Sequence, residues 1–124
     1  MRLQAEDTTE FESVSPVFHV SDIALALAFY CEGLGFNVAW KWGQPATHAS
    51  VCRGRVCITL GLDSTKAGTG DAYIEVGGID NYHAELTTRG VPLGDLADRP
   101  YGMRDFAVTD PSGNRIVFGQ TMGR

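Results

Sequence analysis

The chain has 124 residues, of which 44% are hydrophobic and 20% charged, the balance of an ordinary soluble globular domain. Its net charge of −5 argues against a nucleic-acid-binding protein, because such proteins present basic surfaces. Residues 1–13 do not have the pattern of a signal peptide, and no apolar run is long enough to span a membrane. We therefore expect a cytoplasmic protein that binds neither nucleic acid nor membrane.

The three cysteines, Cys31, Cys52 and Cys57, are consistent with a reducing compartment, because their number is odd and no secretory signal precedes them. Cys52 and Cys57 flank a predicted turn at Gly54, which places them opposite each other on paired strands. We expect both to be reduced strand residues, and not a disulfide or a metal-binding pair.

Residues 1–12 are predicted to form a flexible acidic arm, and a first structural unit follows over residues 13–62. Alternating apolar residues predict a strand at its start. Ser21 or Asp22 can cap the helix that follows, which glycines at 33 and 35 end. The strands of this unit are expected at 14–20, 36–42, 47–53 and 56–62.

A small polar segment over residues 63–70 is predicted to be a linker, and a second unit follows over 71–120. Its helix begins at residue 79, with Asp80 as the expected cap and Gly90 just past the end. The other elements of this unit are a strand at 72–76, a loop or short strand at 91–96, and a closing hairpin at 104–109 and 114–119.

The two units repeat one layout. "VSDI" at 20–23 corresponds to "VGGI" at 76–79, and Gly35 corresponds to Gly90. Each unit reads strand, helix and then three strands, and its single helix can cover only one face of a sheet. The sequence therefore predicts an α+β fold in which two βαβββ modules form a half-barrel with an open cleft.

Two segments, "PVFHVSDIALALAFYCEGLGF" and "PYGMRDFAVTDPSGNRIVF", carry a resemblance to a known family. Together they resemble the vicinal oxygen chelate superfamily of glyoxalases, extradiol dioxygenases and bleomycin-resistance proteins. The resemblance covers residues 14–119, and the second segment is most similar to the bleomycin-resistance-like branch. It implies the same paired-module fold and a small-molecule ligand.

The resemblance also places the metal-ligand positions of the superfamily's enzymes. They fall at Ser15, Thr59, Asp71 and Val117 of this sequence. A catalytic divalent metal needs three or more nitrogen or oxygen ligands, and only Asp71 supplies a carboxylate here. We therefore expect no metal cofactor and no catalytic residues.

One strand of the second unit provides candidate ligand-binding residues. Asp71, Tyr73 and Glu75 alternate with apolar residues and therefore share the face away from the helix. Two carboxylates beside an aromatic ring suit a cationic or hydrogen-bonding ligand. The alternative is that Asp71 ends the linker and Glu75 lies at a solvated rim.

Further candidates come from other strands. His19 could contact a ligand or be held by a carboxylate, and His48 lies on a strand in the same region. The indoles of Trp40 and Trp42 could stack on a planar ring or form core or dimer contacts. Tyr101 and Arg104 border the groove, although Arg104 could also pair with its neighbours.

Together these residues predict a non-catalytic small-molecule-binding protein of the bleomycin-resistance type. It would sequester an aromatic or cationic ligand in a cleft completed by a homodimer, with the arm reaching the partner. The alternative is a metal-dependent lyase, isomerase or dioxygenase of the glyoxalase type. In that case Zn, Ni, Mn or Fe would be held by His19, His48, Asp71 and Glu75.

Overall fold

The computed structural model describes residues 8–123, which form two four-stranded sheets with helices on one side. Each sheet is built from one half of the chain, and both halves follow the predicted order of strand, helix and three strands. The first half contains β1 (Val17–Val20), α1 (Ile23–Leu27), η2 (Ala28–Gly33), β2 (Asn37–Trp42), β3 (His48–Arg53) and β4 (Val56–Leu62). The second contains β5 (Asp71–Glu75), α2 (Ile79–Thr88), β6 (Ala97–Asp98), β7 (Met103–Thr109) and β8 (Arg115–Thr121).

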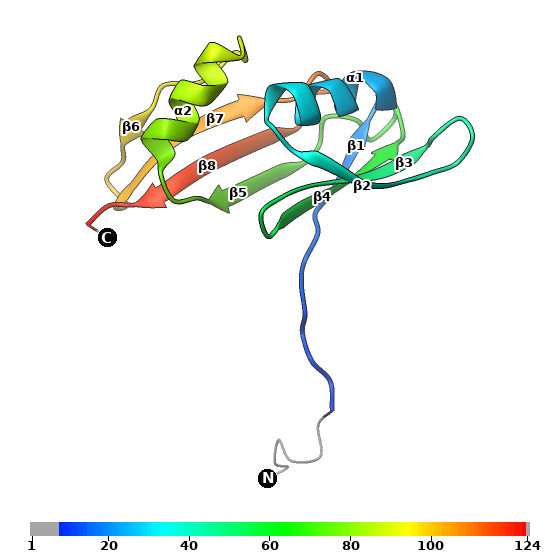
Figure 1. Ribbon diagram of the computed structural model, residues 1–124, viewed down its shortest axis with the longest axis horizontal. Coiled ribbons are helices and arrows are strands. Elements are labelled where there is room, and N and C mark those ends of the chain that lie inside the picture. The colour runs from blue at the N-terminus through cyan, green and yellow to red at the C-terminus, as the bar shows by residue number, and fades with distance from the viewer. Residues whose placement is uncertain (1–7, 124) are drawn as a thin grey trace.

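The two sheets have the same strand order, which confirms the predicted repeat. The first sheet runs β1-β4-β3-β2 and the second runs β5-β8-β7-β6. In both, the first strand pairs in parallel with the last, and the other neighbours are antiparallel. Figure 1 shows the sheets side by side, with residues 8–16 leaving the body as an extended segment. The predicted first strand is therefore shorter at its start than expected, because Val14 lies in this segment and is 86% exposed.

The first helix begins as predicted. The Asp22 side chain accepts a hydrogen bond from the Leu25 backbone N–H at 2.9 Å and caps α1. The helix then widens into the π-helical turns of η2, which bring Tyr30 onto the buried face with Ile23 and Ala26. Gly35 ends the segment with a φ of 80°, a conformation that glycine adopts without strain.

The second helix begins differently from the prediction. The residue just before the helix is Gly78, with a φ of 71°. Asp80 lies in the first turn and does not cap the helix. The backbone N–H of Ile79 instead donates to the side-chain oxygen of Gln120 at 2.9 Å. The cap therefore comes from β8, which the local sequence around Asp80 could not indicate. Over residues 8–123 no helix is long and apolar enough to cross a membrane.

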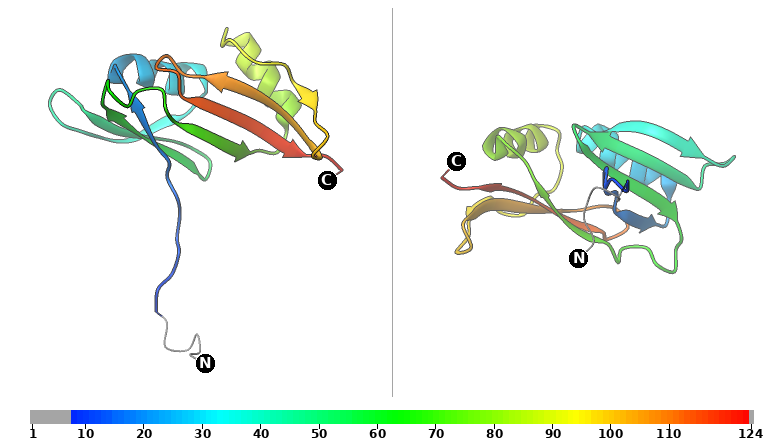
Figure 2. Two further views of the ribbon diagram at one scale, coloured as in Figure 1. Left: turned by 180° about the vertical axis from the view of Figure 1, so that it is seen from behind. Right: turned by 90° about the horizontal axis from the view of Figure 1, so that it is seen from below.

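Figure 2 shows the helices on one side of the two sheets. On that side both sheets contribute to one hydrophobic core. Phe18, Leu60 and Val51 reach it from the first sheet, and Phe106 and Phe118 from the second. Since alternate residues of a strand point to opposite faces, the other face of each sheet carries a separate set of side chains.

A buried polar cluster joins the closing hairpin to the first module. Asp110, 4% exposed, accepts hydrogen bonds from the Tyr30 hydroxyl and the Asn114 side chain, each at 2.9 Å. Asn114 also donates to the His19 carbonyl at 2.8 Å and accepts from the Gly70 N–H at 2.7 Å. The turn over residues 110–113, which joins the two strands of the predicted closing hairpin, therefore also holds β1 beside the start of β5.

An ion pair connects the modules at the other end of the core. The Arg53 guanidinium of β3 binds both carboxylate oxygens of Glu85 on α2, at 2.8 and 3.0 Å. It also donates to the Leu34 carbonyl and lies over the Tyr82 ring, 4.9 Å from its centroid. This hydrogen-bonded pairing lowers the pKa of the Glu85 carboxyl below its ordinary value.

Candidate ligand-binding site

The candidate site lies on the two sheet faces that the helices leave uncovered, which we call open face A (β1–β4) and open face B (β5–β8). Seven of the nine predicted binding residues lie on strands whose register places them there, and Tyr101 is joined to face B by a hydrogen bond. Face A carries His19, Trp40, Trp42 and His48, whereas face B carries Asp71, Tyr73, Glu75 and Tyr101.

Open face A is an aromatic surface. The strand register aligns Trp42, His48, Gly61 and His19 in one row across the four strands. The next row contains Trp40, opposite Ser50, which pairs with Thr59. Trp42 is 68% exposed and Trp40 47% exposed, so both indoles are accessible to a ligand or a partner chain and neither is core.

The Trp42 ring is positioned by its neighbour. It meets the His48 imidazole edge to face, with centroids 5.9 Å apart and planes at 70°. The imidazole is held in turn by Thr47, whose hydroxyl oxygen lies 3.0 Å from His48 Nδ1. Two aromatic rings are thus held in fixed positions on an otherwise uncharged surface.

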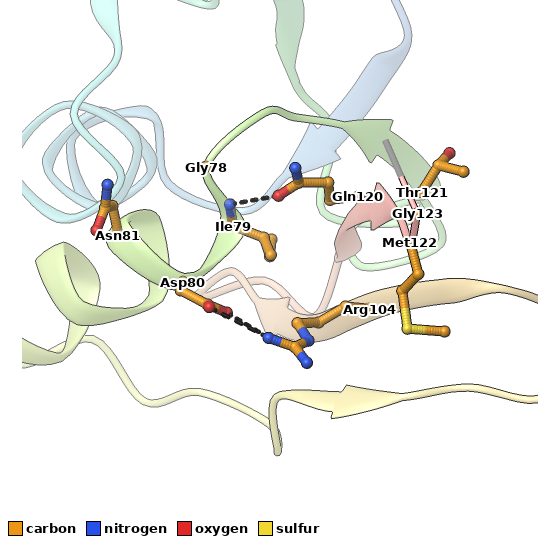
Figure 3. A pocket seen from close by; sticks show the side chains of 9 residues that line it. All are labelled: Gly78, Ile79, Asp80, Asn81, Arg104, Gln120, Thr121, Met122 and Gly123. Carbon is orange, nitrogen blue, oxygen red and sulfur yellow. Dashed lines mark hydrogen bonds and ion pairs between the residues drawn. The ribbon is translucent and has the colours of Figure 1, made fainter.

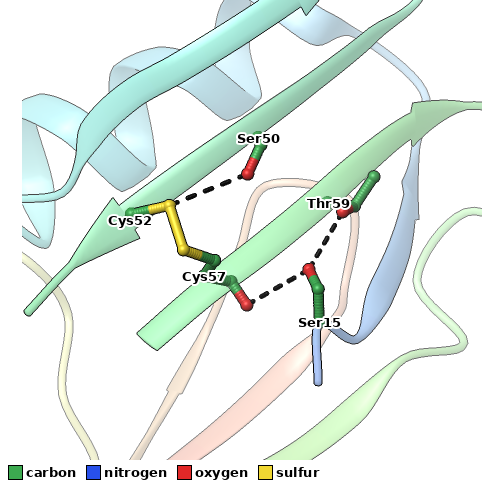
Figure 4. The surroundings of a disulfide bond; sticks show 5 residues. All are labelled: Ser15, Ser50, Cys52, Cys57 and Thr59. Atoms are coloured by element: carbon green, nitrogen blue, oxygen red, sulfur yellow. Dashed lines mark hydrogen bonds between the residues drawn. A yellow bond between two sulfur atoms is a disulfide. The ribbon is translucent and has the colours of Figure 1, made fainter. Parts of the chain in front are cut away.

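The far row of open face A contains a disulfide between Cys52 and Cys57 (Figure 4). The two residues are direct register partners on β3 and β4, as the predicted hairpin required. Our expectation that both are reduced is therefore wrong in this structure. Their Cα atoms are only 4.1 Å apart, which brings the two sulfur atoms within bonding reach.

Open face B is organised around a buried carboxylate, that of Asp105 on β7, whose side chain is 4% exposed. It accepts hydrogen bonds from the hydroxyls of Tyr73 at 2.9 Å and Tyr101 at 2.6 Å. Arg99 Nε donates to its other oxygen at 2.8 Å. Asp105 is not among the residues predicted to bind a ligand, and no local pattern in the sequence indicates that it gathers three side chains.

These contacts fix the protonation of the cluster. Burial acts to raise the pKa of Asp105, but the hydrogen bonds from Tyr101, Arg99 and Tyr73 hold it below its ordinary value. Loss of hydration and the bond to Asp105 raise the pKa of Tyr73 to about 12. The hydrogen bond to Asp105 likewise raises the pKa of Tyr101. At neutral pH the cluster therefore holds an ionised carboxylate, a guanidinium and two neutral phenols.

A groove of about 640 Å³ runs along open face B beside this cluster. Apolar Ala107 and Val117 form part of its lining, and Arg115 borders it. Arg115 Nη1 lies 3.6 Å from Asp71 Oδ1 at the exposed end of the face. The volume and the mixed lining suit a small organic molecule better than an ion.

Arg104 does not lie with the other predicted binding residues. It points to the helix side of the second sheet, where it lines a pocket at the start of α2 (Figure 3). Its guanidinium binds Asp98 at 2.6 Å and Asp80 at 3.1 Å. The reason is strand alternation: Arg104 shares parity with the core residues Phe106 and Val108, whereas Asp105 points to the open face.

The four positions at which the superfamily's enzymes hold a metal do not fit one here. The hydroxyls of Ser15 and Thr59 hydrogen-bond each other at 3.0 Å, and Ser15 also donates to the Cys57 carbonyl. Asp71 is paired with Arg115, and Val117 has no donor atom. We therefore derive no reaction through a metal at these positions.

Paired βαβββ modules with an aromatic open face and a groove place the chain in a class of small-molecule-binding proteins. The comparisons agree with this class. Residues 14–118 match the glyoxalase/bleomycin resistance protein/dioxygenase superfamily, and the chain belongs to it.

Relatives and solved structures lie in the same branch. A bleomycin resistance protein of Geobacillus stearothermophilus is 31% identical, covering 85% of this chain and 93% of its own. The crystal structure of a bleomycin-binding protein from Streptomyces verticillus, complexed with copper(II)-bleomycin, matches with a TM-score of 0.77 and 26% identity over 94% of this chain and 100% of its own. An antibiotic binding protein from Streptomyces sp. CB03234 matches with a TM-score of 0.74 and 26% identity over 91% and 99%.

Proposed function

We propose that this protein is a non-catalytic binding protein of the bleomycin-resistance type, which sequesters a small aromatic, cationic molecule such as a bleomycin. The observation that carries the proposal is the pairing of an exposed aromatic surface, open face A, with a charged groove on open face B. The resemblance to bleomycin resistance and bleomycin-binding proteins supports the choice of ligand.

Each face has a part in recognition. Trp40 and Trp42 offer exposed indoles on which flat rings of a ligand stack. Tyr73 and Tyr101 add phenol rings beside the groove, and Glu75, exposed two residues further along β5, supplies negative charge on the same face. Sequestration then follows from mass action, because a bound molecule is withheld from its target without being altered.

We further propose that two copies of the chain complete the site. Both open faces are uncovered in a single protomer, and open face A leaves Trp40, Trp42 and Val17 at least 47% exposed. The segment that precedes β1 extends away from its own body, with Phe11 fully exposed (Figure 1). A partner chain that covers these side chains would close the two faces into a cleft and give the arm a surface to contact.

Calorimetric titration with metal-free bleomycin tests the proposal. Saturable binding is expected, with the ligand recovered chemically unchanged as judged by mass spectrometry. Trp42→Ala should weaken binding by about tenfold, the loss of one stacking contact of about 1.5 kcal/mol. Arg104→Gln is the matched control, because Arg104 lies on the opposite side of the sheet and its loss should leave affinity unchanged.

Four outcomes would contradict parts of this proposal. Absence of saturable binding would overturn the choice of bleomycin, and conversion of the ligand would overturn sequestration. Unchanged affinity in Glu75→Gln would remove charge pairing with the ligand. Light scattering should give twice the chain mass, and a monomer that still binds the ligand would overturn the completed cleft.

A further inference from the structure

Two of the three histidines in the chain converge above a single glycine on open face A. Gly61 of β4 pairs with His19 on one side and with His48 on the other. A Cβ placed on Gly61 would lie 3.5 Å from Cδ2 of each imidazole and 3.7 Å from His48 Nε2. Both rings thus lie over the position that a side chain on Gly61 would occupy. Their strands, β1 and β3, are not neighbours, because β4 lies between them.

The rings present nitrogen atoms that can bind a metal ion. The Thr47 hydroxyl lies 3.0 Å from His48 Nδ1, and a hydrogen bond donated by Nδ1–H leaves the lone pair on Nε2, the atom beside Gly61. This is how a neighbouring group fixes the tautomer and orientation of a metal-binding imidazole. Trp42 packs edge to face on the His48 ring and limits its rotation.

His19 is held through its backbone. Its carbonyl accepts hydrogen bonds from the Asn114 side chain at 2.8 Å and from the Gly68 N–H at 3.3 Å. Its imidazole is half-buried beside β4, so the ring reaches the space above Gly61 from a fixed starting point. Strand pairing therefore fixes the backbones of both histidines, whose imidazoles supply the two nitrogen donors.

We propose that His19 and His48 form a two-imidazole binding site for a divalent transition-metal ion such as Ni²⁺, Cu²⁺ or Zn²⁺, with water in the remaining positions. Neutral imidazoles prefer these ions, whereas Mg²⁺ and Ca²⁺ require oxygen ligands. Within residues 8–123 no group of three or more His, Cys, Asp or Glu side chains could share an ion. The site is therefore a two-ligand chelate, separate from the superfamily positions at Ser15, Thr59, Asp71 and Val117.

Titration of tag-free protein with Ni²⁺ alone tests this site without any organic ligand. The wild-type chain should bind one Ni²⁺. His19→Ala and His48→Ala should each weaken binding by about 10- to 100-fold, because removing even a group that hydrogen-bonds a metal ligand costs this much affinity. His83→Ala is the matched control. Its imidazole packs on Phe106 of the core, with centroids 5.0 Å apart, and its loss should leave Ni²⁺ affinity unchanged.

The titration decides whether the two histidines bind the ion together. Unchanged affinity in either His19→Ala or His48→Ala would overturn the site, as would an equal loss in His83→Ala. If a variant fails to fold, the wild-type protein loaded with one Cu²⁺ still decides the question, because electron spin echo modulation must show two coordinated imidazoles. A spectrum showing one imidazole or none would overturn the site. Bleomycin binding is measured separately, so the proposed function can fail or hold independently.

Discussion

Open faces A and B have the same strand arrangement, but the space above the central glycine is open on face A and filled on face B. Gly61 and Gly119 are equivalent, because their first-strand partners, His19 and Glu75, directly precede the corresponding valines at 20 and 76. On the third strand they pair with His48 and Asp105. Above Gly61 the imidazoles of His19 and His48 leave a gap. Above Gly119 the Tyr73 ring occupies the space, because its hydroxyl crosses the glycine to reach Asp105.

The difference shows how a repeated module acquires two distinct surfaces. In both sheets the glycine removes a side chain from the centre of the open face. On face B the freed space is used to satisfy a buried carboxylate, and the result is rigid and charged. On face A the space stays open between two imidazoles, and the result is accessible. The Asp105 cluster contributes stability beside the groove of face B, whereas the space above Gly61 on face A is accessible.

Replacing Asp105 on β7, or its equivalent His48 on β3, should give the largest difference in stability between the two faces. Asp105→Ala leaves Tyr73, Tyr101 and Arg99 without their common acceptor, and should lower the free energy of unfolding by about 2 to 3 kcal/mol. His48→Ala, at the equivalent place on face A, should change it by less than about 0.5 kcal/mol. Urea unfolding at neutral pH measures both, and equal losses would contradict the contrast.

The disulfide is a second difference between the sheets. Cys52 and Cys57 are joined on face A, whereas the equivalent pair on face B is Thr109 and Arg115, which has no crosslink. Reduction should lower the free energy of unfolding by about 2 kcal/mol, because the crosslink closes a short loop in the unfolded chain.

The free thiol needs its own control in this measurement. Cys31→Ser keeps the crosslink and removes the remaining thiol, so it should show the same loss on reduction. Unfolding curves that coincide with and without reductant would mean that the pair contributes nothing to stability. In that case the first sheet is as independent of a crosslink as the second.

Alanine at the two equivalent glycines gives the most direct comparison. In Gly119→Ala the new methyl group meets the Tyr73 hydroxyl and displaces it from Asp105, which should cost about 1 to 2 kcal/mol. In Gly61→Ala the methyl group makes ordinary contacts at 3.5 Å with the two imidazoles, and stability should change by less than about 0.5 kcal/mol.

Thermal unfolding of both variants measures this difference, and neither result is confounded by backbone strain. Neither glycine has a positive φ, so alanine is compatible with both backbones. If Gly61→Ala proved as damaging as Gly119→Ala, the space above Gly61 would be closed in solution. The two-imidazole site would then lose its geometric basis.

The sequence predicted what depends on alternation and turns. The faces of Asp71, Tyr73 and Glu75, the helix cap at Asp22 and the repeated layout all follow from local patterns and are confirmed. The side of the sheet on which Arg104 lies could also have been predicted, since it is two residues from Phe106 and therefore shares the core side. Applying the alternation rule to that strand would have corrected it.

What could not be predicted depends on side chains that meet across the chain. Tyr73 reaches Asp105 from 32 residues away. His19 and His48 approach the same glycine only because β4, from later in the sequence, lies between their strands. The Cys52–Cys57 pairing was predicted in register, but bond formation depends on how closely the two strands approach. No local pattern reports such distances.

The smallest expected effect is the stability lost at high pH, when the Tyr73 phenol ionises and can no longer donate to Asp105. The pKa of Tyr73 rises from 10.0 to about 12 in the folded protein, so its contribution to stability is complete below pH 10 and is lost as the pH rises toward 12. The wild-type protein should therefore lose more stability across this window than Tyr73→Phe does. Tyr73 is 46% exposed, and solvent screening limits the difference to about 1 kcal/mol. The comparison is made in a Tyr101→Phe background, because Tyr101 shares Asp105 with Tyr73. Tyr30 and Tyr82 then titrate in both proteins and cancel in the difference, so equal losses would mean that the phenol above Gly119 is as loosely held as the imidazoles above Gly61.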